Sequence, residues 1–246
     1  MSKKNRDNDR AARAAAALEA QQREERRRRN LMVGGVVGVI LVIVLGGYFV
    51  SRSLDTTTEV DAPAAGSEFG LTIGPDDAPN KVIIYEDFLC PFCGELEAAT
   101  RDDLAQLAAD GKVQVEYRPF DLLGGGDESS YSVRSAGAFS IVLDKSGATV
   151  AKKFHDLLFE NQPDERASSF PKSSELADLA VEAGAEESQV RDPIEADEGN
   201  AWVVKATKAA GDAGVRSTPT VLLNGEVFQE GTTIDDIAEN LIAKLQ

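Results

Sequence analysis

Between residues 68 and 246, the apolar residues follow two kinds of spacing, one typical of strands and one typical of helices. Short β-branched runs bounded by Gly, Pro or Asn are typical of strands, and apolar residues at every third or fourth position are typical of helices. We predict strands at 69–73, 81–85, 113–118, 221–223 and 226–228. We predict helices at 91–109, 130–145, 148–161, 174–183, 196–211 and 233–245.

The order of these elements indicates an α/β domain with an interruption. A strand, a helix and a strand follow one another up to residue 118, and the alternation returns near residue 214 with a hairpin signal at Asn224-Gly225. The intervening residues, about 120–196, are mainly helical by pattern, and we interpret them as a helical insertion laid over the sheet. Within it, Ser173 is expected to cap one helix and Gly184 to end it.

A different pattern occupies residues 31–50, which carry no charge and are mostly β-branched residues or glycine. Twenty helical residues rising ~1.5 Å each match the ~30 Å hydrocarbon core of a bilayer. We therefore predict a single transmembrane helix at 31–50, preceded by a basic flank at 1–30 and followed by a polar tether at 51–67. A cleaved signal peptide is the alternative, with Ala62-Pro63-Ala64 as its only small-residue cleavage site.

Charge is distributed unevenly about that segment. Residues 1–30 hold ten Lys or Arg and five Asp or Glu, whereas residues 51–246 hold 16 and 37. Because basic residues concentrate on the cytoplasmic side, the N-terminus is expected in the cytoplasm and residues 68–246 outside the cell membrane. An acidic domain of this kind argues against nucleic-acid binding, which requires a basic surface.

The candidate chemistry lies in Cys90-Pro91-Phe92-Cys93, between a predicted strand and a predicted helix. Pro91 suits the first helical position, so Cys90 should lie at the helix N-terminus, where free N–H groups and the helix dipole favour a thiolate. A second Cys three residues on can close a small disulfide and reopen it by exchange. This pattern predicts a redox-active pair, Cys90 and Cys93, at the start of a thioredoxin-like fold.

Two other interpretations of the cysteine pair fit less well. A structural zinc site needs about four ligands, and the chain has 2 Cys and 1 His. A purely structural disulfide over so short a loop would constrain the unfolded chain little. We therefore expect no metal, and no cofactor beyond the redox-active disulfide itself.

Several segments together resemble the DsbA-like thiol:disulfide oxidoreductases of bacterial cell envelopes, over roughly residues 69–246. They are the lead-in Glu86-Asp87-Phe88, the Cys90-Pro91-Phe92-Cys93 motif, residues 154–159 with Gln162, and Ser217-Thr218-Pro219-Thr220 before the Asn-Gly hairpin. The resemblance implies that Pro219 is cis and packs beside the cysteines, with the Thr218 backbone open to an extended substrate. Pro91, Phe92, Thr218 and Pro219 would then shape the site, with the Cys90 sulfur facing outward.

The chain departs from that family at two positions. Many relatives carry a buried acid six residues before the first Cys, which serves the second Cys as proton acceptor, and here that residue is Ile84. Glu86 or Asp87 is the candidate replacement, although both could equally be solvated carboxylates at a strand end. Strong oxidants of the family carry His between the cysteines, and Phe92 cannot stabilise the thiolate in that way, so a weaker oxidant is expected.

The lone histidine, His155, is a less direct candidate. It lies in a predicted helix of the insertion, and we assign it a packing or hydrogen-bonding role rather than that of a catalytic base. Phe154 and Trp202 are predicted core residues.

The hypothesis from sequence is a membrane-anchored oxidoreductase that oxidises reduced or unfolded secreted proteins through Cys90, with Cys93 as the resolving thiol. Its partners would be those substrates, a membrane reoxidase or thiol reductant, and the lipid bilayer through residues 31–50. A reductase or isomerase of the same chemistry is one alternative. A thioredoxin-like chaperone that binds extended chains without turnover is the other.

Overall fold

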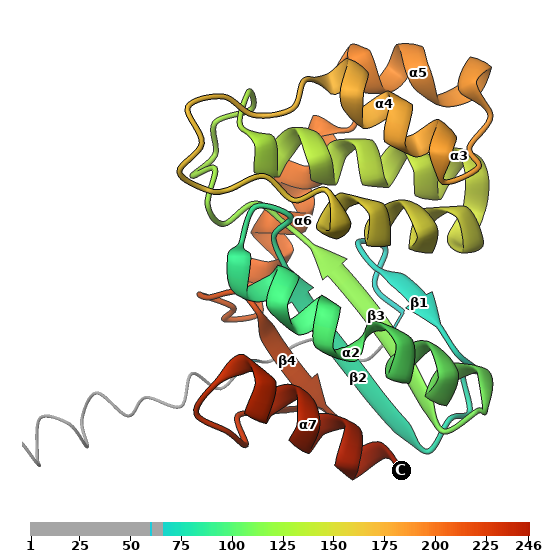
Figure 1. Ribbon diagram of the computed structural model, residues 1–246, viewed down its shortest axis with the longest axis vertical. Coiled ribbons are helices and arrows are strands. Elements are labelled where there is room, and N and C mark those ends of the chain that lie inside the picture. Colours follow the sequence, from blue (N-terminus) through green and yellow to red (C-terminus); the bar gives the residue numbers. More distant parts are fainter. Residues whose placement is uncertain (1–59, 61–65) are drawn as a thin grey trace, which may run out of the picture. The chain divides into compact units, whose positions relative to one another are not determined.

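The computed structural model describes residues 60 and 66–246. Within them, five strands form one sheet in the order β1-β3-β2-β4-β5 (Figure 1). The strands are β1 (Leu71–Ile73), β2 (Asn80–Glu86), β3 (Val113–Pro119), β4 (Thr220–Leu223) and β5 (Glu226–Val227). The helices are α2 (Pro91–Ala109), α3 (Tyr131–Glu160), α4 (Ser173–Glu182), α5 (Glu187–Glu195), α6 (Asn200–Asp212) and α7 (Ile234–Leu245).

Strand β2 is the centre of the sheet. It pairs parallel with β3 and antiparallel with β4, while β1 and β5 add antiparallel edges. A parallel pair needs a crossover connection, and α2 supplies it between β2 and β3. This connection places the start of α2 beside the end of the central strand, which is where the cysteine motif lies.

The alternation of β2 assigns its side chains to two different cores. Val82 and Ile84 pack with α2 and α7 on one face, whereas Ile83 and Tyr85 pack on the other face with Phe120 and with residues from α6 to β4. Figure 1 shows α2 and α7 together on one side of the strands. The core of the sheet is therefore buried on both faces, as expected for a central strand with few polar residues.

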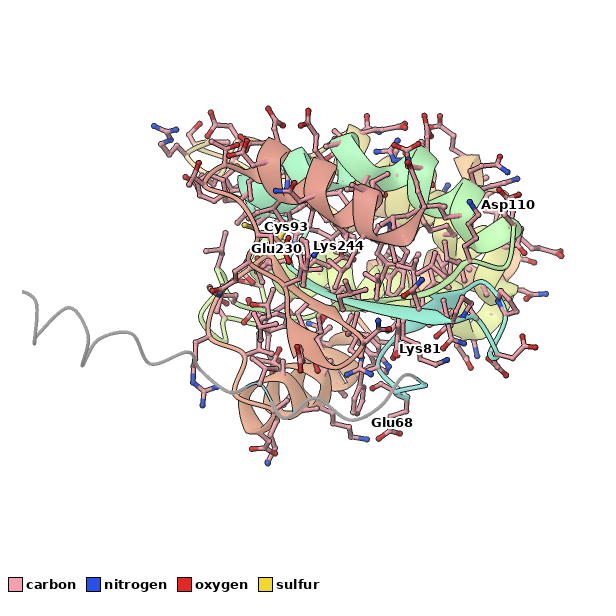
Figure 2. The ribbon with its side chains drawn as sticks, turned by 90° about the horizontal axis from the view of Figure 1, so that it is seen from below. Glu68, Lys81, Cys93, Asp110, Glu230 and Lys244 are labelled. Carbon is pink, nitrogen blue, oxygen red and sulfur yellow. The ribbon has the colours of Figure 1, made fainter. Side chains whose placement is uncertain are left out.

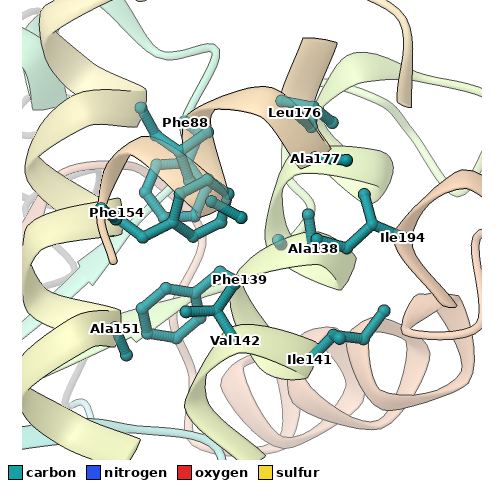
Figure 3. Packing of buried hydrophobic residues seen from close by; sticks show 14 of the residues in the cluster. Phe88, Ala138, Phe139, Ile141, Val142, Ala151, Phe154, Leu176, Ala177 and Ile194 are labelled. Atoms are coloured by element: carbon teal, nitrogen blue, oxygen red, sulfur yellow. The ribbon is translucent and has the colours of Figure 1, made fainter. Parts of the chain in front are cut away.

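The helices between β3 and β4 form a further core of their own. Phe88, from the turn after β2, packs there with residues of α3, α4 and α5, including Phe139, Phe154 and Leu176 (Figure 3). Phe154 is fully buried and Trp202 packs against this cluster, so both predicted core residues are confirmed. Through Phe88 the helical core contacts the cysteine turn directly.

The structure revises the predicted helices in this region. The two predicted helices at 130–145 and 148–161 are confirmed as the two halves of α3, which are separated by a kink at Gly147, whose φ of 78° is not helical. Helix α5 was not predicted, because Pro193 lies inside it and only Val190 and Ile194 are buried. Helix α6 begins at Asn200 rather than at residue 196.

The predicted cap of α4 was wrong by one residue. Lys172, not Ser173, is the N-cap, and its backbone N–H donates to the Glu175 carboxylate at 2.8 Å. Ser173 instead donates its hydroxyl to Asp197 at 2.7 Å. The expected end of the helix at Gly184 is confirmed by its φ of 105°, a conformation that glycine adopts without strain.

The predicted tether ends in contact with the domain. The Glu116 carboxylate of β3 accepts hydrogen bonds from the Gly66 and Ser67 backbone N–H groups at 2.8 and 2.9 Å and is also paired with Arg118. Val60 packs against the core that contains Tyr85 and Phe120. The basic flank at 1–30, the predicted span at 31–50 and most of the tether lie outside the described residues. Among residues 60 and 66–246, no helix is long and apolar enough to cross a bilayer.

Candidate active site

Cys90 lies at the N-terminus of α2, as the sequence predicted. It is the N-cap residue, with extended backbone angles, and Pro91 occupies the first turn. The Cys90 carbonyl accepts hydrogen bonds from the Cys93 and Gly94 N–H groups at 3.0 and 3.2 Å. The Cys90 sulfur is thus held at the positive end of a helix of 19 residues.

The second half of the site comes from the loop before β4. The Thr218–Pro219 peptide bond is cis, as the resemblance implied. The Cys90 thiol donates to the Thr218 carbonyl oxygen across 3.4 Å, joining two segments 128 residues apart. Both cysteines are free thiols in this structure.

The pKa values of the two thiols are shifted in opposite directions from that of a free cysteine. The hydrogen bond from the Cys93 thiol, together with contacts to Thr218 and to the N–H groups of Phe92 and Cys93, outweighs burial and lowers the pKa of Cys90 to about 6. Burial, followed by the hydrogen bond and charge of Cys90, raises the pKa of Cys93 well above that of a free thiol. At neutral pH, Cys90 is therefore the nucleophile and Cys93 retains its proton.

The cysteine motif exposes an apolar side chain rather than its sulfur atoms. Cys90 is only 4% exposed, so the expectation of an outward-facing sulfur was wrong in degree, because the Thr218 segment covers it. Phe92 is 55% exposed, and Leu123 is 44% exposed. Cys93 is buried, whereas Asp110 at the far end of α2 and Glu68, also labelled in Figure 2, are exposed and lie away from the cysteines. The outer face of the motif thus offers the Phe92 ring to a partner.

Gln162, from the residues that carried the resemblance, fastens the cysteine turn to the helical core. Its side-chain amide donates to the carbonyl oxygens of Phe88 and Cys90 at 3.0 and 2.9 Å. Gly94 leaves room for it, because a Cβ on Gly94 would lie 2.4 Å from the Gln162 Oε1 atom. These two hydrogen bonds from Gln162 fix the backbone at Cys90 and two residues before it.

The two acids of the lead-in have different roles, and neither is solvated. Asp87 accepts three backbone N–H bonds of 2.9 Å, from Leu89, Leu122 and Leu123, and so organises the turn and the loop after β3. Glu86 is 2% exposed, and its Oε1 atom lies 2.6 Å from the His155 Nε2 atom. The interpretation of both acids as strand-end carboxylates in water was wrong.

His155 connects Glu86 with a group of charged residues that the sequence did not identify. It is fully buried, and its Nδ1 atom lies 3.2 Å from Asp156 and 3.6 Å from Glu97. Lys152 pairs with both of those carboxylates, and Arg101 pairs with Glu97 at 3.3 Å. The predicted hydrogen-bonding role of His155 is confirmed. The spacing of four residues between Glu97 and Arg101, and between Lys152 and Asp156, was the signal available in the sequence.

Glu97, His155 and Asp156 also have ligand atoms within 4.8 Å of one another, a separation that would suit a metal ion. The Lys152 ammonium already lies between the two carboxylates, 3.2 Å from Glu97. A second cation there would be repelled by it. The arrangement is that of a buried ion-pair group.

The helix-capping cysteine, its buried partner and the adjacent cis-proline are the features of a thioredoxin-type redox site. The profile of the thioredoxin family matches residues 67–242, and the chain belongs to that family. Among solved structures, the chain is similar to the reduced disulfide bond oxidoreductase DsbG from Mycobacterium tuberculosis, with 30% identity and a TM-score of 0.63 over 74% of this chain and 88% of that one.

One further solved structure supports the same class, and a curated relative matches a part of the chain. DsbA from Mycobacterium tuberculosis, in its oxidised form, is 29% identical with a TM-score of 0.60, over 72% of this chain and 90% of that chain. The serine/threonine-protein kinase PknE of the same organism is 31% identical over 120 residues, 48% of this chain. The chain spans about a fifth, 21%, of the length of that curated relative. The resemblance to DsbA-like thiol:disulfide oxidoreductases is thereby confirmed for the domain.

Proposed function

We propose that this protein is a membrane-anchored thiol:disulfide oxidase that introduces disulfides into secreted or cell-envelope proteins through Cys90 and Cys93. The observation that carries the proposal is the position of the Cys90 sulfur, at a helix N-terminus and 3.4 Å from the Thr218 carbonyl. There the sulfur is a stabilised leaving group and a substrate strand can pair with the Thr218 backbone.

The reaction begins with the oxidised Cys90–Cys93 pair. A substrate thiolate attacks the Cys90 sulfur, the S–S bond breaks, and Cys93 takes the electron pair and then a proton. A second substrate thiolate attacks the substrate sulfur of the mixed disulfide, and Cys90 leaves as a thiolate. The substrate loses two electrons to the cysteine pair, which a membrane reoxidase accepting two electrons would restore to the disulfide.

The location rests on the sequence. The uncharged residues 31–50, with ten basic residues before them, support a single span with the N-terminus in the cytoplasm and the domain outside. Disulfides persist in that oxidising environment. The tether would keep the active site near the membrane, within reach of a membrane reoxidase.

The direct test is to trap the intermediate. Cys93→Ser should accumulate mixed disulfides between Cys90 and a substrate supplied in its disulfide form, because the Cys90 thiolate breaks the substrate S–S bond and no second thiol is left to resolve the product. The wild-type chain, started in its oxidised form, should catalyse oxidative refolding of a reduced protein. Absence of both would remove the proposal. A chaperone function would appear instead as client binding that persists when both cysteines are replaced by Ser.

The direction of exchange needs a separate measurement, the reduction potential of the Cys90–Cys93 pair in a glutathione buffer. A potential near about −120 mV is that of a strong oxidase, and one near about −270 mV is that of a reductase. Because Phe92 cannot stabilise the thiolate as a histidine would, we expect a value between these two. A value at or below the lower figure would favour the reductase alternative.

A further inference from the structure

The end of the predicted tether is bound into the domain by a buried carboxylate. Glu116 of β3 is fully buried, and it accepts the Gly66 and Ser67 backbone N–H groups at 2.8 and 2.9 Å. The Arg118 side chain donates two hydrogen bonds of 2.9 and 3.0 Å to the same carboxylate. Gly70 leaves room for it, because a Cβ there would lie 2.3 Å from the Glu116 Oε1 atom. A buried charge is costly unless it is paired and hydrogen-bonded, so the N–H groups of the tether help to satisfy Glu116.

Apolar contacts hold the other described residue of this part of the tether. Val60 packs against the core that contains Tyr85 and Phe120, on the face of the sheet away from α2 and α7. Ser67 and Tyr85 line a cavity of only about 30 Å³, so little space remains under the tether. We call Val60, Gly66 and Ser67 the docked segment.

The docked segment begins at the same end of the sheet as the cysteine turn. Tyr85 is the next-to-last residue of β2, and Cys90 follows it by five positions. Phe120 comes directly after β3, and its N–H group donates to the Glu86 carbonyl oxygen at 2.9 Å, so the carboxyl ends of β2 and β3 lie side by side. Because Val60 packs on the cluster of Tyr85 and Phe120, the chain enters the domain at the end that carries the redox pair.

Docking limits how far the domain can move from the predicted span at 31–50. Between that span and Val60 lie residues 51–59, nine in number. Nine residues reach at most about 30 Å, whereas the 17 residues 51–67 would reach about 60 Å if the docked segment were released. The effective concentration of a tethered group falls roughly as the −3/2 power of linker length. Docking therefore raises the effective concentration of the domain at the membrane surface about two- to threefold.

We propose that the docked segment holds the catalytic domain close to the bilayer, with the cysteine pair at its membrane end, and that the partners of the pair are thiols and disulfides carried at the membrane surface. Such partners are envelope proteins that are still membrane-bound and the reactive cysteines of a membrane reoxidase. A short linker gives no advantage toward proteins that are free in solution. The inference rests on the proposed membrane anchor and on the proposed chemistry of the cysteine pair.

The first test concerns the docking, by hydrogen exchange of the full-length chain in lipid vesicles. The Gly66 and Ser67 amides should exchange slowly, because they are bonded to a buried carboxylate. Ser67→Pro removes one of these donors and should release the docked segment, so that the Gly66 amide exchanges fast. Glu68→Pro is the matched control, because Glu68 follows Ser67 in the turn closed by the Gly70 N–H at 3.2 Å, a position that suits proline. Fast exchange of both amides in the wild type would overturn the docking.

The second test concerns the partners. Vesicles that hold the reduced full-length chain also carry a nitrobenzoate disulfide linked to a lipid headgroup, and soluble dithiobis(nitrobenzoate) is the reference reagent. The Cys90 thiolate attacks the lipid-side sulfur, the reagent S–S bond breaks, and the coloured nitrobenzoate thiolate leaves. Ser67→Pro should react about two- to threefold more slowly than the wild type with the lipid-linked reagent and equally fast with the soluble one. Glu68→Pro should match the wild type with both reagents.

A second variant lengthens the linker and keeps every docking contact. Insertion of eight Gly and Ser residues between Thr58 and Glu59 adds as many residues as lie from Val60 to Ser67. It should slow the reaction with the lipid-linked reagent as Ser67→Pro does, and it decides alone if Ser67→Pro does not fold. An unchanged or faster rate in the insertion variant would overturn the proposal.

Failure of the proposed function would look different. A wild-type chain without redox chemistry would release no coloured thiolate from the soluble reagent. A wild-type chain without a membrane anchor would not float with the vesicles in a density gradient. Both are measured on the same preparation, so each failure is separable from a failure of the docking.

Discussion

At the residue scale, the site depends on the difference in pKa between the Cys90 and Cys93 thiols at the start of α2. The helix start alone predicted a lowered pKa for Cys90. The structure adds that the hydrogen bond between the cysteines lowers the pKa of Cys90 and that burial raises the pKa of Cys93. Two residues of the motif allow this site to be tested by substitution. They are Phe92, between the cysteines, and Gly94, which follows them.

Phe92→His should lower the pKa of Cys90 below its value of about 6 and make the pair a stronger oxidant. A protonated imidazole between the cysteines would stabilise the thiolate, which the phenyl ring cannot do. The rate of Cys90 alkylation against pH gives the pKa, and equilibration with glutathione gives the potential. Phe92→Leu is the control and should leave both near the wild-type values. An unchanged pKa in Phe92→His would contradict this account of thiolate stabilisation.

Gly94→Ala should destabilise the site by moving Gln162, whose Oε1 atom would lie 2.4 Å from the new methyl group. Loss of the two hydrogen bonds that Gln162 donates should lower the free energy of unfolding by about 1–3 kcal/mol. Urea unfolding followed by Trp202 fluorescence measures the change.

The control for this prediction is a double-mutant cycle with Gln162→Ala. In that background Gly94→Ala meets no amide and should cost little. Equal costs in the two backgrounds would show that Gln162 does not fasten the cysteine turn.

The residue scale also marks the limit of sequence reasoning. The sequence left open whether Glu86 or Asp87 takes part in the site, and the partner of Glu86, His155, lies 69 residues away on α3. Nothing in the local pattern predicts that contact, because it depends on how the insertion packs. His155 was therefore predicted correctly as a hydrogen-bonding residue, with its partner unknown.

At the element scale, the reliability of prediction followed the strength of local signals. Helix α2 was predicted from Pro91 to Ala109 as observed, because Pro91 marks its start and Asp110-Gly111 its end. Strands β2 and β3 were predicted to within one or two residues. Helix α5 was missed because a proline inside a short, polar segment is a signal against a helix.

The packing of α6 against α3 gives a prediction about a single glycine. A Cβ at Gly199 would lie 2.1 Å from the Gly137 carbonyl oxygen, which is backbone and cannot rotate away. Gly199→Ala should therefore destabilise the domain by about 2–3 kcal/mol, the usual cost of an overpacked contact. Thermal or urea unfolding tests this.

Gly211 in the same helix is the matched control. Its Cβ would meet only Arg216, at 3.8 Å, and its φ is not in the left-handed region. Gly211→Ala should stabilise α6 by about 0.5–1 kcal/mol, since alanine loses less backbone entropy in a helix. If Gly199→Ala and Gly211→Ala change the free energy of unfolding by similar amounts, the close approach of Gly199 to the Gly137 backbone does not contribute to stability.

At the scale of the whole molecule, the buried charges should make stability depend on pH. Burial alone would lower the pKa of His155, but Glu86 and Glu97 outweigh it and raise the pKa to about 9, from an ordinary value of 6.5. A raised folded pKa stabilises the folded state fully below the unfolded value, and this contribution is lost as pH rises through about 9. The pKa of Glu86 is also raised by burial, which acts in the same direction at lower pH.

The oxidised chain should therefore lose about 1–3 kcal/mol of unfolding free energy between pH 6.5 and 9. The oxidised form is used because its cysteines do not titrate, whereas the lowered pKa of Cys90 would add stability over the same range in the reduced form. Urea unfolding at a series of pH values measures the slope. His155→Gln should flatten it, and a wild-type slope of the opposite sign would contradict the assignment of charge to His155.

The contact between Cys90 and the Thr218 carbonyl joins positions 128 residues apart, with the whole helical insertion between them. A ribosome therefore delivers both thiols long before it delivers the segment that covers them. Until that segment arrives, the nascent polypeptide carries two ordinary cysteines in the wrong surroundings for exchange with other proteins. Redox competence is thus a property of the finished domain, and an arrested or truncated translation product would be inert toward clients although its cysteine motif is intact.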